Sequence, residues 1–415
     1  MTTKNRMLKK PGIYIHIPFC ISRCIYCGFF SGAGAVSEED EHAYVRLIKQ
    51  EIENATRRYA EYYDEVDSIF FGGGTPSVFK PESLIEILDA VRKGFRLSAD
   101  CEITMEANPG TLSRKNLTKL RKNGFNRLSL GCQSMNENVL RTLGRIHSAE
   151  EFLESFEAAR TSGFDNINVD LMFSVPGADE VVWQDSLDRI VDLSPEHISF
   201  YSLQIEEDTP LYDMYRSGLF SEVSDEMDRK MYHQAIRTLK SAGYLHYEIS
   251  NAAKPGCECR HNIKYWKLYD YIGFGKSAAS FVRGTRFTNS TDEGYEVGVK
   301  EEKNFIEGHL GVLPPSTDES DSLPEYALKK YSEYHINSFM DSASEFVFLG
   351  LRMASGVNYA DFRERFGREF SDVFSDRMEE VKEFISCGAL IEDESGIRLS
   401  ENGFDISNRI MALFV

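Results

Sequence analysis

The stretch IYIHIPFCISRCIYCGFF, residues 13–30, joins a short apolar run to three closely spaced cysteines. The run IYIHI at 13–17 is rich in β-branched residues, which is typical of a strand buried on both faces of a parallel sheet. Cys20, Cys24 and Cys27 follow it almost directly. We therefore expect the cysteines in a loop at the carboxyl end of that strand, where α/β barrels bind their ligands.

The pattern of an apolar run followed by an amphipathic helical segment repeats through the first half of the chain. The further runs are SIFFGG (68–73), EITMEA (102–107), RLSLGC (127–132), NINVDLMF (166–173) and HISFYSLQ (197–204). Six consecutive strand-helix units predict an α/β fold built on a barrel of the TIM type, either complete or a partial (β/α)6 barrel.

Composition limits the classes of partner. The chain has 415 residues, 47 Lys plus Arg against 66 Asp plus Glu, and a net charge of −19, so a nucleic acid would be repelled. No apolar run approaches the roughly 20 residues that span a bilayer, and no signal peptide is recognisable. Eight cysteines are too few for a secreted disulfide scaffold. We expect a cytoplasmic protein with no integral membrane segment.

Polar or glycine residues lie at the ends of several predicted strands. Gly72, Gly73 and Gly74 precede Thr75, and missing side chains would let the backbone approach a ligand closely. Three polar residues end or interrupt later runs: Glu106, Gln133 and Asp170. A tight turn and structural hydrogen bonds are the alternative interpretation.

Three thiolates suit two kinds of metal site. A structural zinc ion would need a fourth ligand, for which His16 is a candidate. An iron–sulfur cubane held by three thiolates would leave one iron open to a small molecule. The compact spacing and the lack of a second CxxC pair favour the cluster.

The motif CxxxCxxC after the first strand, with GGGTP after the second, resembles the radical SAM superfamily. Within it, the chain from about residue 12 to its end is similar to the oxygen-independent coproporphyrinogen III oxidase group, HemN and HemW. The motifs that carry this likeness are YIHIPFCxxxCxYC, EANPGT, GCQS, GRIH, VDLMFSVPG, YEISN and HNIKYW.

This resemblance implies a [4Fe–4S] cluster on Cys20, Cys24 and Cys27, with S-adenosylmethionine (SAM) on its open iron and cleavage of SAM to a 5′-deoxyadenosyl radical. It assigns these SAM contacts: Tyr14, Tyr26, Gly73, Gly74, Thr75, Glu106, Gln133, Arg145 and Asp170. The polar strand-end residues noted above recur in this set. The resemblance also implies an electron donor such as flavodoxin or ferredoxin.

Three features favour the HemW branch, whose members are haem chaperones. Phe29 stands where the oxidase branch has a further cysteine, and only thirteen residues precede Tyr14 where the oxidases have an extension. HNIKYW at 261–266 resembles the HNxxYW motif of HemW, so the likeness implies haem as cargo, bound by His261 and delivered to acceptor haemoproteins. The alternatives are a coproporphyrinogen III oxidase that makes protoporphyrinogen IX, and a cluster protein that only carries electrons.

The chain is expected to divide into a barrel (1–220), an α+β extension with the HNIKYW motif (221–335) and a winged-helix-like tail (336–415). The tail is predicted as helix, helix, hairpin and helix, and its many acidic residues disfavour DNA binding. His261 would then lie in a different domain from the cluster. From the residues alone, a histidine beside two aromatic residues is also compatible with core packing.

Overall fold

A mixed sheet of twelve strands organises the part of the chain that the computed structural model describes, residues 10–308 and 323–415. Its six central parallel strands are β1 (Gly12–Ile17), β4 (Val66–Gly73), β5 (Leu97–Ala107), β6 (Arg127–Gln133), β7 (Ile167–Phe173) and β8 (His197–Ser202). These are the six predicted strands, in sequence order across the sheet. The predicted partial barrel is therefore confirmed.

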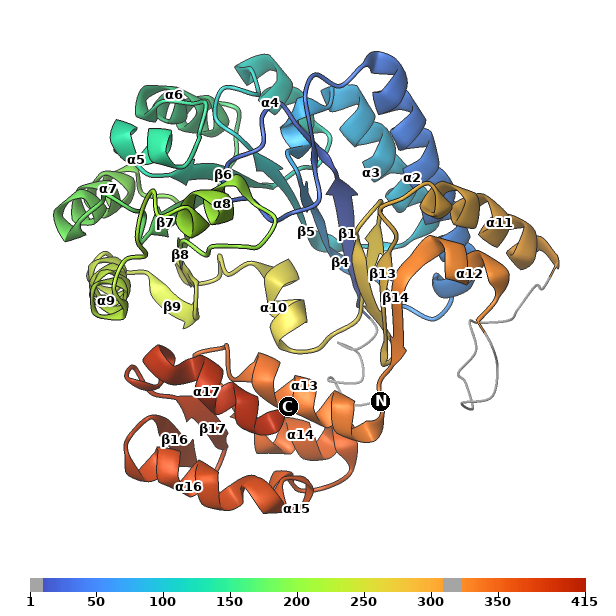
Figure 1. The fold of residues 1–415 in the computed structure, drawn as a ribbon. Coiled ribbons are helices and arrows are strands. Elements are labelled where there is room, and N and C mark those ends of the chain that lie inside the picture. Colours follow the sequence, from blue (N-terminus) through green and yellow to red (C-terminus); the bar gives the residue numbers. More distant parts are fainter. Residues whose placement is uncertain (1–9, 309–322) are drawn as a thin grey trace.

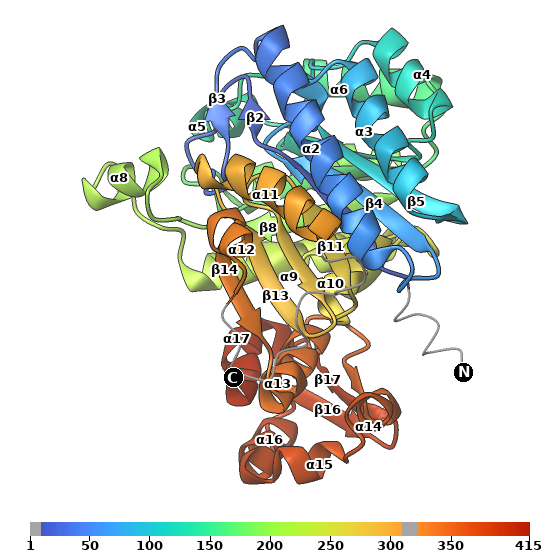
Figure 2. The same cartoon turned by 90° about the vertical axis from the view of Figure 1, so that its right-hand side faces the viewer.

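Helices cover the outer face of the parallel strands (Figures 1 and 2). They are α2 (Glu38–Tyr59), α3 (Pro81–Gly94), α4 (Arg114–Lys122), α5 (Glu137–Thr142), α6 (Ala149–Thr161), α7 (Glu180–Leu193) and α9 (Asp225–Ser241). Alternation along a strand decides which side chains face them. Ile13, Ile15 and Ile17 of β1 belong to the main core together with Ile48 of α2, so Tyr14 and His16 point into the barrel.

Residues 221–335, expected as an α+β extension, add strands to the barrel sheet at both edges. Beyond β8 lie β10 (Asn251–Ala253) and β9 (Leu245–Glu248), and beyond β1 lie β11 (Tyr271–Phe274), β12 (Ala279–Val282), β13 (Thr285–Asn289) and β14 (Tyr331–Ile336). Three helices, α8 (Pro210–Arg216), α11 (Gly294–Gly308) and α12 (Glu325–Lys330), complete this segment with α10 (Arg260–Trp266). The strands on either side of residue 220 therefore belong to one sheet. Residues 309–322 of the segment lie outside the described part.

The carboxyl-terminal region lies below the barrel, next to α10 and far from the cysteine loop (Figures 1 and 2). Its helices are α13 (Phe339–Gly350), α14 (Tyr359–Phe366), α15 (Phe370–Val373), α16 (Met378–Ser386) and α17 (Ser407–Met411). A small sheet pairs β15 (Val357–Asn358), β17 (Gly396–Leu399) and β16 (Leu390–Asp393). The predicted hairpin and the helices on either side of it are present, but α15 and α16 also stand between the second predicted helix and the hairpin. Among the described residues, no helix is both long and apolar enough to cross a bilayer.

Candidate functional site

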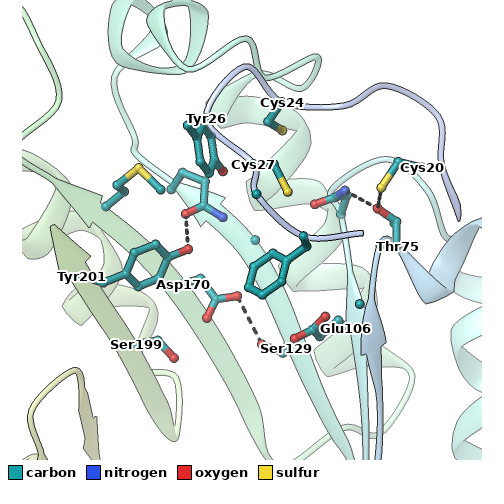
Figure 3. Close-up of a pocket in the computed structure, with 18 of the residues that line it drawn as sticks. Cys20, Cys24, Tyr26, Cys27, Thr75, Glu106, Ser129, Asp170, Ser199 and Tyr201 are labelled. Carbon is teal, nitrogen blue, oxygen red and sulfur yellow. Dashed lines mark hydrogen bonds between the residues drawn. The ribbon is translucent and has the colours of Figure 1, made fainter. Parts of the chain in front are cut away.

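A cavity of about 770 Å³ opens at the carboxyl ends of the parallel strands (Figure 3). The cysteine loop and its short strand β2 (Phe19–Cys20) form one rim, and α10 contributes to the inner end. Every residue that the resemblance assigned to the cluster or to SAM lines this cavity, except Tyr14. Tyr14 lies in the barrel interior, where its hydroxyl is 3.1 Å from Nδ1 of His16.

The three cysteines stand along the loop over the cavity, none in a disulfide (Figure 3). Sγ of Cys20 lies 3.3 Å from Oγ1 of Thr75, and Sγ of Cys24 accepts a hydrogen bond from Arg145 Nη1 at 3.3 Å. Burial raises the pKa of the Cys27 thiol, so a metal or a positive charge is needed to favour its thiolate.

The spacing of these thiols bears on the kind of metal site. Within residues 10–308 and 323–415, no three His, Cys, Asp or Glu side chains converge closely enough to hold one metal ion. A cubane cluster offers a separate iron to each thiolate, so its ligands need not converge on one point. His16 uses both ring nitrogens, towards Tyr14 and the carbonyl oxygen of Phe30. His16 therefore has no free ring nitrogen with which to complete a zinc site in this arrangement.

The glycine-rich loop after β4 fixes the cysteine loop through backbone contacts. Gly74 N donates to the carbonyl oxygen of Ile17 at 2.9 Å, and Thr75 N donates to that of Phe19 at 2.8 Å. Gly73 has a φ of +107°, and a Cβ there would lie 2.5 Å from Cε1 of His16. Only glycine fits this position, which lets the backbone approach the cavity.

Two carboxyl groups share the cavity wall below the cysteines (Figure 3). Burial, aided by the nearby Asp170 carboxylate, raises the pKa of Glu106 to about 8. Burial also raises the pKa of Asp170, against hydrogen bonds from Asn168 at 2.8 Å and Ser129 at 3.2 Å. At neutral pH Glu106 therefore keeps its proton, and the pair presents both a donor and an acceptor to a ligand.

Arg145 and Gln133 are held by residues that the sequence analysis did not select. Arg145 Nη2 donates to Asn108 Oδ1 at 2.7 Å, and Asn108 Nδ2 donates to Thr75 Oγ1 at 2.9 Å. The Tyr201 hydroxyl donates to Gln133 Oε1 at 2.9 Å. Asn108 lies within EANPGT directly after a predicted strand, so its position could have marked it as a candidate site residue. Tyr201 had no such signal, because whether its side chain points into the barrel depends on the register of β8.

His261, on α10, packs directly against the barrel strands β1 and β4. The residue is fully buried, with Nδ1 3.1 Å from Ser68 Oγ on β4 and Nε2 2.8 Å from the Tyr265 hydroxyl. Its ring stacks on Phe70 and Tyr14, with centroids 5.4 and 6.4 Å away. Burial lowers the pKa of His261 to about 3, so the imidazole is neutral, which is the form that binds a metal.

The nearby cysteines act as core residues. Cys259 is fully buried, and its thiol donates to Glu102 Oε1 at 3.6 Å. Cys257 packs beside Trp266 in a small apolar cluster with Tyr247. This arrangement agrees with packing, and not with a second metal site on these thiols.

Known proteins resemble this chain along its whole length. The model for the radical SAM superfamily matches residues 14–190, and the model for the HemN C-terminal domain matches residues 340–406. "Heme chaperone HemW" of Bacillus subtilis (strain 168) is 31% identical over 97% of this chain and 98% of its own. HemW of Escherichia coli (strain K12) is 39% identical over 66% of this chain and 71% of its own.

Among solved structures, coproporphyrinogen III oxidase (HemN) from Escherichia coli is similar, with a TM-score of 0.78. It is 21% identical, and the match covers 99% of this chain and 91% of that one. At this identity the likeness concerns the fold, and it includes the carboxyl-terminal region.

Proposed function

Because this chain belongs to the HemN/HemW group of the radical SAM superfamily, we propose that it binds haem and transfers it to acceptor haemoproteins. The observation that carries the proposal is the similarity to a haem chaperone along almost the whole of both chains. That similarity extends past the barrel to α10, with its HNIKYW motif, and to the carboxyl-terminal region. An electron donor such as flavodoxin or ferredoxin belongs to the same proposal.

Cys20, Cys24 and Cys27 are proposed to hold a [4Fe–4S] cluster, with SAM in the cavity beneath it. When bound, these cofactors supply an open iron and one-electron chemistry. This chain supplies the side chains and backbone groups around the two cofactors. Arg145 places a guanidinium N–H donor 3.3 Å from Sγ of Cys24. The backbone of Gly73 and Gly74 offers polar groups without side chains in the way.

The remaining SAM contacts are proposed from the cavity wall. Glu106, Gln133 and Asp170 offer hydrogen-bonding groups, and Tyr26 and Thr75 lie nearer the rim. Tyr14 stays in the proposed set of SAM contacts, and its hydroxyl lies 3.1 Å from Nδ1 of His16.

His261 is the proposed haem ligand, with the neutral imidazole that iron requires. Its Nε2 is occupied by the Tyr265 hydroxyl and its ring is enclosed by Tyr14 and Phe70. Binding of haem iron therefore requires the Tyr265 hydrogen bond to break and α10 to move away from the strands. Haem binding and a shift of α10 should occur together.

The first experiment is an anaerobic titration of cluster-loaded protein with haem, followed by absorption spectroscopy. We compare the wild type with His261→Ala and with a matched control, His197→Ala. His197 is also buried, and its ring nitrogens also contact an amide oxygen and a tyrosine hydroxyl, at 2.6 and 2.8 Å. We expect stoichiometric binding that His261→Ala loses and His197→Ala keeps.

Two results would contradict the proposal. Haem binding that survives in His261→Ala would remove the proposed ligand. Conversion of coproporphyrinogen III to protoporphyrinogen IX over many turnovers would assign an oxidase activity instead.

A further inference from the structure

Asn108 lies in the cavity wall directly after β5, in contact with the glycine-rich loop on one side and Arg145 on the other. Its side-chain Oδ1 accepts a hydrogen bond from Arg145 Nη2 at 2.7 Å, and its Nδ2 donates to Thr75 Oγ1 at 2.9 Å. Both partners in turn contact a cysteine. Thr75 Oγ1 lies 3.3 Å from Sγ of Cys20 (Figure 3), and Arg145 Nη1 donates to Sγ of Cys24 at 3.3 Å. Asn108 is therefore the middle of a chain of hydrogen bonds that joins two of the three thiols.

The guanidinium group of Arg145 fixes the direction of the hydrogen bonds in this chain. It has donors only, so the amide of Asn108 must turn its oxygen towards Arg145 and its NH2 group towards Thr75. The hydroxyl oxygen of Thr75 then accepts from Asn108, and its single hydrogen is left to point at Cys20. A cysteine that binds a metal does so as the thiolate, which can only accept. Both ends of the chain therefore present a hydrogen to sulfur.

The side chain of Asn108 is not what holds its own turn. The backbone carbonyl oxygen of Asn108 accepts hydrogen bonds from the hydroxyl and the backbone nitrogen of Thr111, at 2.6 and 3.2 Å. The backbone nitrogen of Asn108 donates to Ser77 Oγ at 3.4 Å. Both hydrogen bonds of the side-chain amide therefore go to the cavity wall and not to the turn.

Of the two partners of Asn108, Thr75 depends on it more than Arg145 does. Arg145 has a second anchor, because its Nη2 also donates to the carbonyl oxygen of Gly131 at 2.7 Å. The Thr75 hydroxyl does not cap the helical turn that follows it. Among the described residues it contacts only Asn108 and Cys20. The amide of Asn108 therefore decides where the Thr75 hydrogen points.

We infer that Asn108 is a positioning residue, which orients the Thr75 hydroxyl to donate a hydrogen bond to Cys20 and thereby raises the reduction potential of the cluster. This inference rests on the proposed [4Fe–4S] cluster. Hydrogen bonds to the ligating sulfurs are one of the factors that set the potential of such a cluster, because the donor stabilises the negative charge that reduction adds. Since Asn108 is not a ligand, its replacement should change the potential and leave the cluster in place.

The test measures the reduction potential in anaerobically reconstituted protein without SAM, by redox titration followed by electron paramagnetic resonance. Thr75→Val keeps the size of the side chain and removes the hydroxyl donor, so it should lower the potential. Thr75→Ser keeps the hydroxyl and should keep the wild-type value. Asn108→Asp replaces the amide by acceptor oxygens, so the Thr75 hydrogen should turn away from Cys20. The potential should then fall further than in Thr75→Val, since the added negative charge also lowers it.

A double-mutant cycle separates the hydrogen bond from the added charge. In a Thr75→Val background the bond to Cys20 is already absent, so Asn108→Asp should lower the potential only by its charge. Its effect should therefore be smaller than in the wild type, by the amount that Thr75→Val alone lowers the potential. Asn262→Asp is the matched control, because Asn262 of α10 lines the same cavity outside this chain of hydrogen bonds. It should have the same effect in both backgrounds.

A second variant and a second measurement keep the result decisive if Asn108→Asp does not hold a cluster. Asn108→Leu removes the amide without adding charge and leaves the Thr75 hydroxyl free to rotate, so the potential should lie between those of the wild type and Thr75→Val. Electron–nuclear double resonance of the reduced cluster, in water and in heavy water, detects exchangeable protons near it. One such proton should be present in the wild type and in Thr75→Ser, and absent in Thr75→Val.

The outcomes separate this inference from the proposed cluster. If the wild type binds no iron and sulfide on reconstitution, the proposed cluster fails and the inference fails with it. If the wild type holds the cluster and Thr75→Val leaves its potential unchanged, only the inference is overturned. The inference is also overturned if Asn108→Asp lowers the potential equally in both backgrounds, or if Asn108→Leu keeps the wild-type value, because Asn108 then does not orient Thr75.

Discussion

Glu106 in the cavity wall is a carboxyl group whose pKa is raised by its surroundings. Burial and the adjacent Asp170 act in the same direction, so the pKa rises from the ordinary 4.5 to about 8. The folded protein therefore holds a proton that the unfolded chain releases above pH 4.5. The consequence is a free energy of unfolding that falls as the pH rises through this window.

Replacing this carboxyl group should remove that pH dependence. Between about pH 5 and pH 8, the wild type should lose a few kcal/mol of stability relative to Glu106→Gln, since the variant has no proton to release. Urea unfolding of cluster-loaded protein without SAM, at both pH values, measures the difference. Glu154→Gln, at an exposed position of α6, is the control. A constant difference between wild type and Glu106→Gln across the range would show that Glu106 titrates normally.

Site residues at strand ends could be predicted from the sequence because the fold fixes where the end of each parallel strand lies. Glu106, Gln133 and Asp170 end or interrupt successive parallel strands, and adjacent strands bring such residues to one side of a barrel. His261 had no comparable signal, and it reaches the barrel only because α10 folds back beneath it.

Two glycines with a positive φ have different surroundings: Gly73, which ends β4 before η1 (Pro76–Val78), and Gly177, which lies between β7 and α7. Gly73 needs its positive φ and has the His16 ring against it. Gly177 also has a positive φ, +83°, but nothing lies within 4 Å of a Cβ built there. An alanine would be strained by the positive φ at either position, but only at position 73 would its Cβ also collide with another side chain, His16.

Comparing Gly73→Ala with Gly177→Ala separates the cost of the contact with His16 from the cost of the backbone strain. Gly73→Ala should cost the strain of about 1–2 kcal/mol and, in addition, displace His16 and the end of β1, so that SAM binding is lost. Gly177→Ala should cost the strain alone and leave SAM binding unchanged. Calorimetric titration with SAM and thermal unfolding of both variants give the two readouts. Equal SAM affinity in both variants would mean that the loop does not approach the ligand.

The strands and the helices of the tail could be predicted because hydrophobic periodicity is visible in a short stretch of sequence. Which strands pair with each other depends on contacts between distant residues, and these leave no local pattern. The pattern gave no reason to join β11 to β1 or β10 to β8, and these pairings make residues 221–335 part of the barrel sheet. Contacts between distant segments also fix the carboxyl-terminal region. Ile249 N donates to the carbonyl oxygen of Arg352, and Ala354 N donates to that of Tyr247.

Arg352 joins the carboxyl-terminal region to the barrel floor. Its guanidinium group lies 4.2 Å from the ring centroid of Trp266, and Nη2 lies 3.4 Å from Oε2 of Glu248. Glu248 is fully buried, and burial raises its pKa while Arg352 lowers it. The cation therefore opposes the effect of burial on this carboxyl group and stacks on a residue that lines the cavity.

Removing this cation should affect both parts of the molecule. Arg352→Ala should destabilise the protein by about 1–3 kcal/mol, since Glu248 loses its counter-charge. The loss should grow with pH, because the pKa of Glu248 rises further and its ionisation then opposes folding. Arg398→Ala removes an arginine from a more exposed pair with Asp393, which should cost at most about 1 kcal/mol. Urea unfolding at two pH values and the fluorescence of Trp266 measure the effects. Equal losses in the two variants, with unchanged fluorescence, would mean that the carboxyl-terminal region does not act on the barrel floor through Arg352.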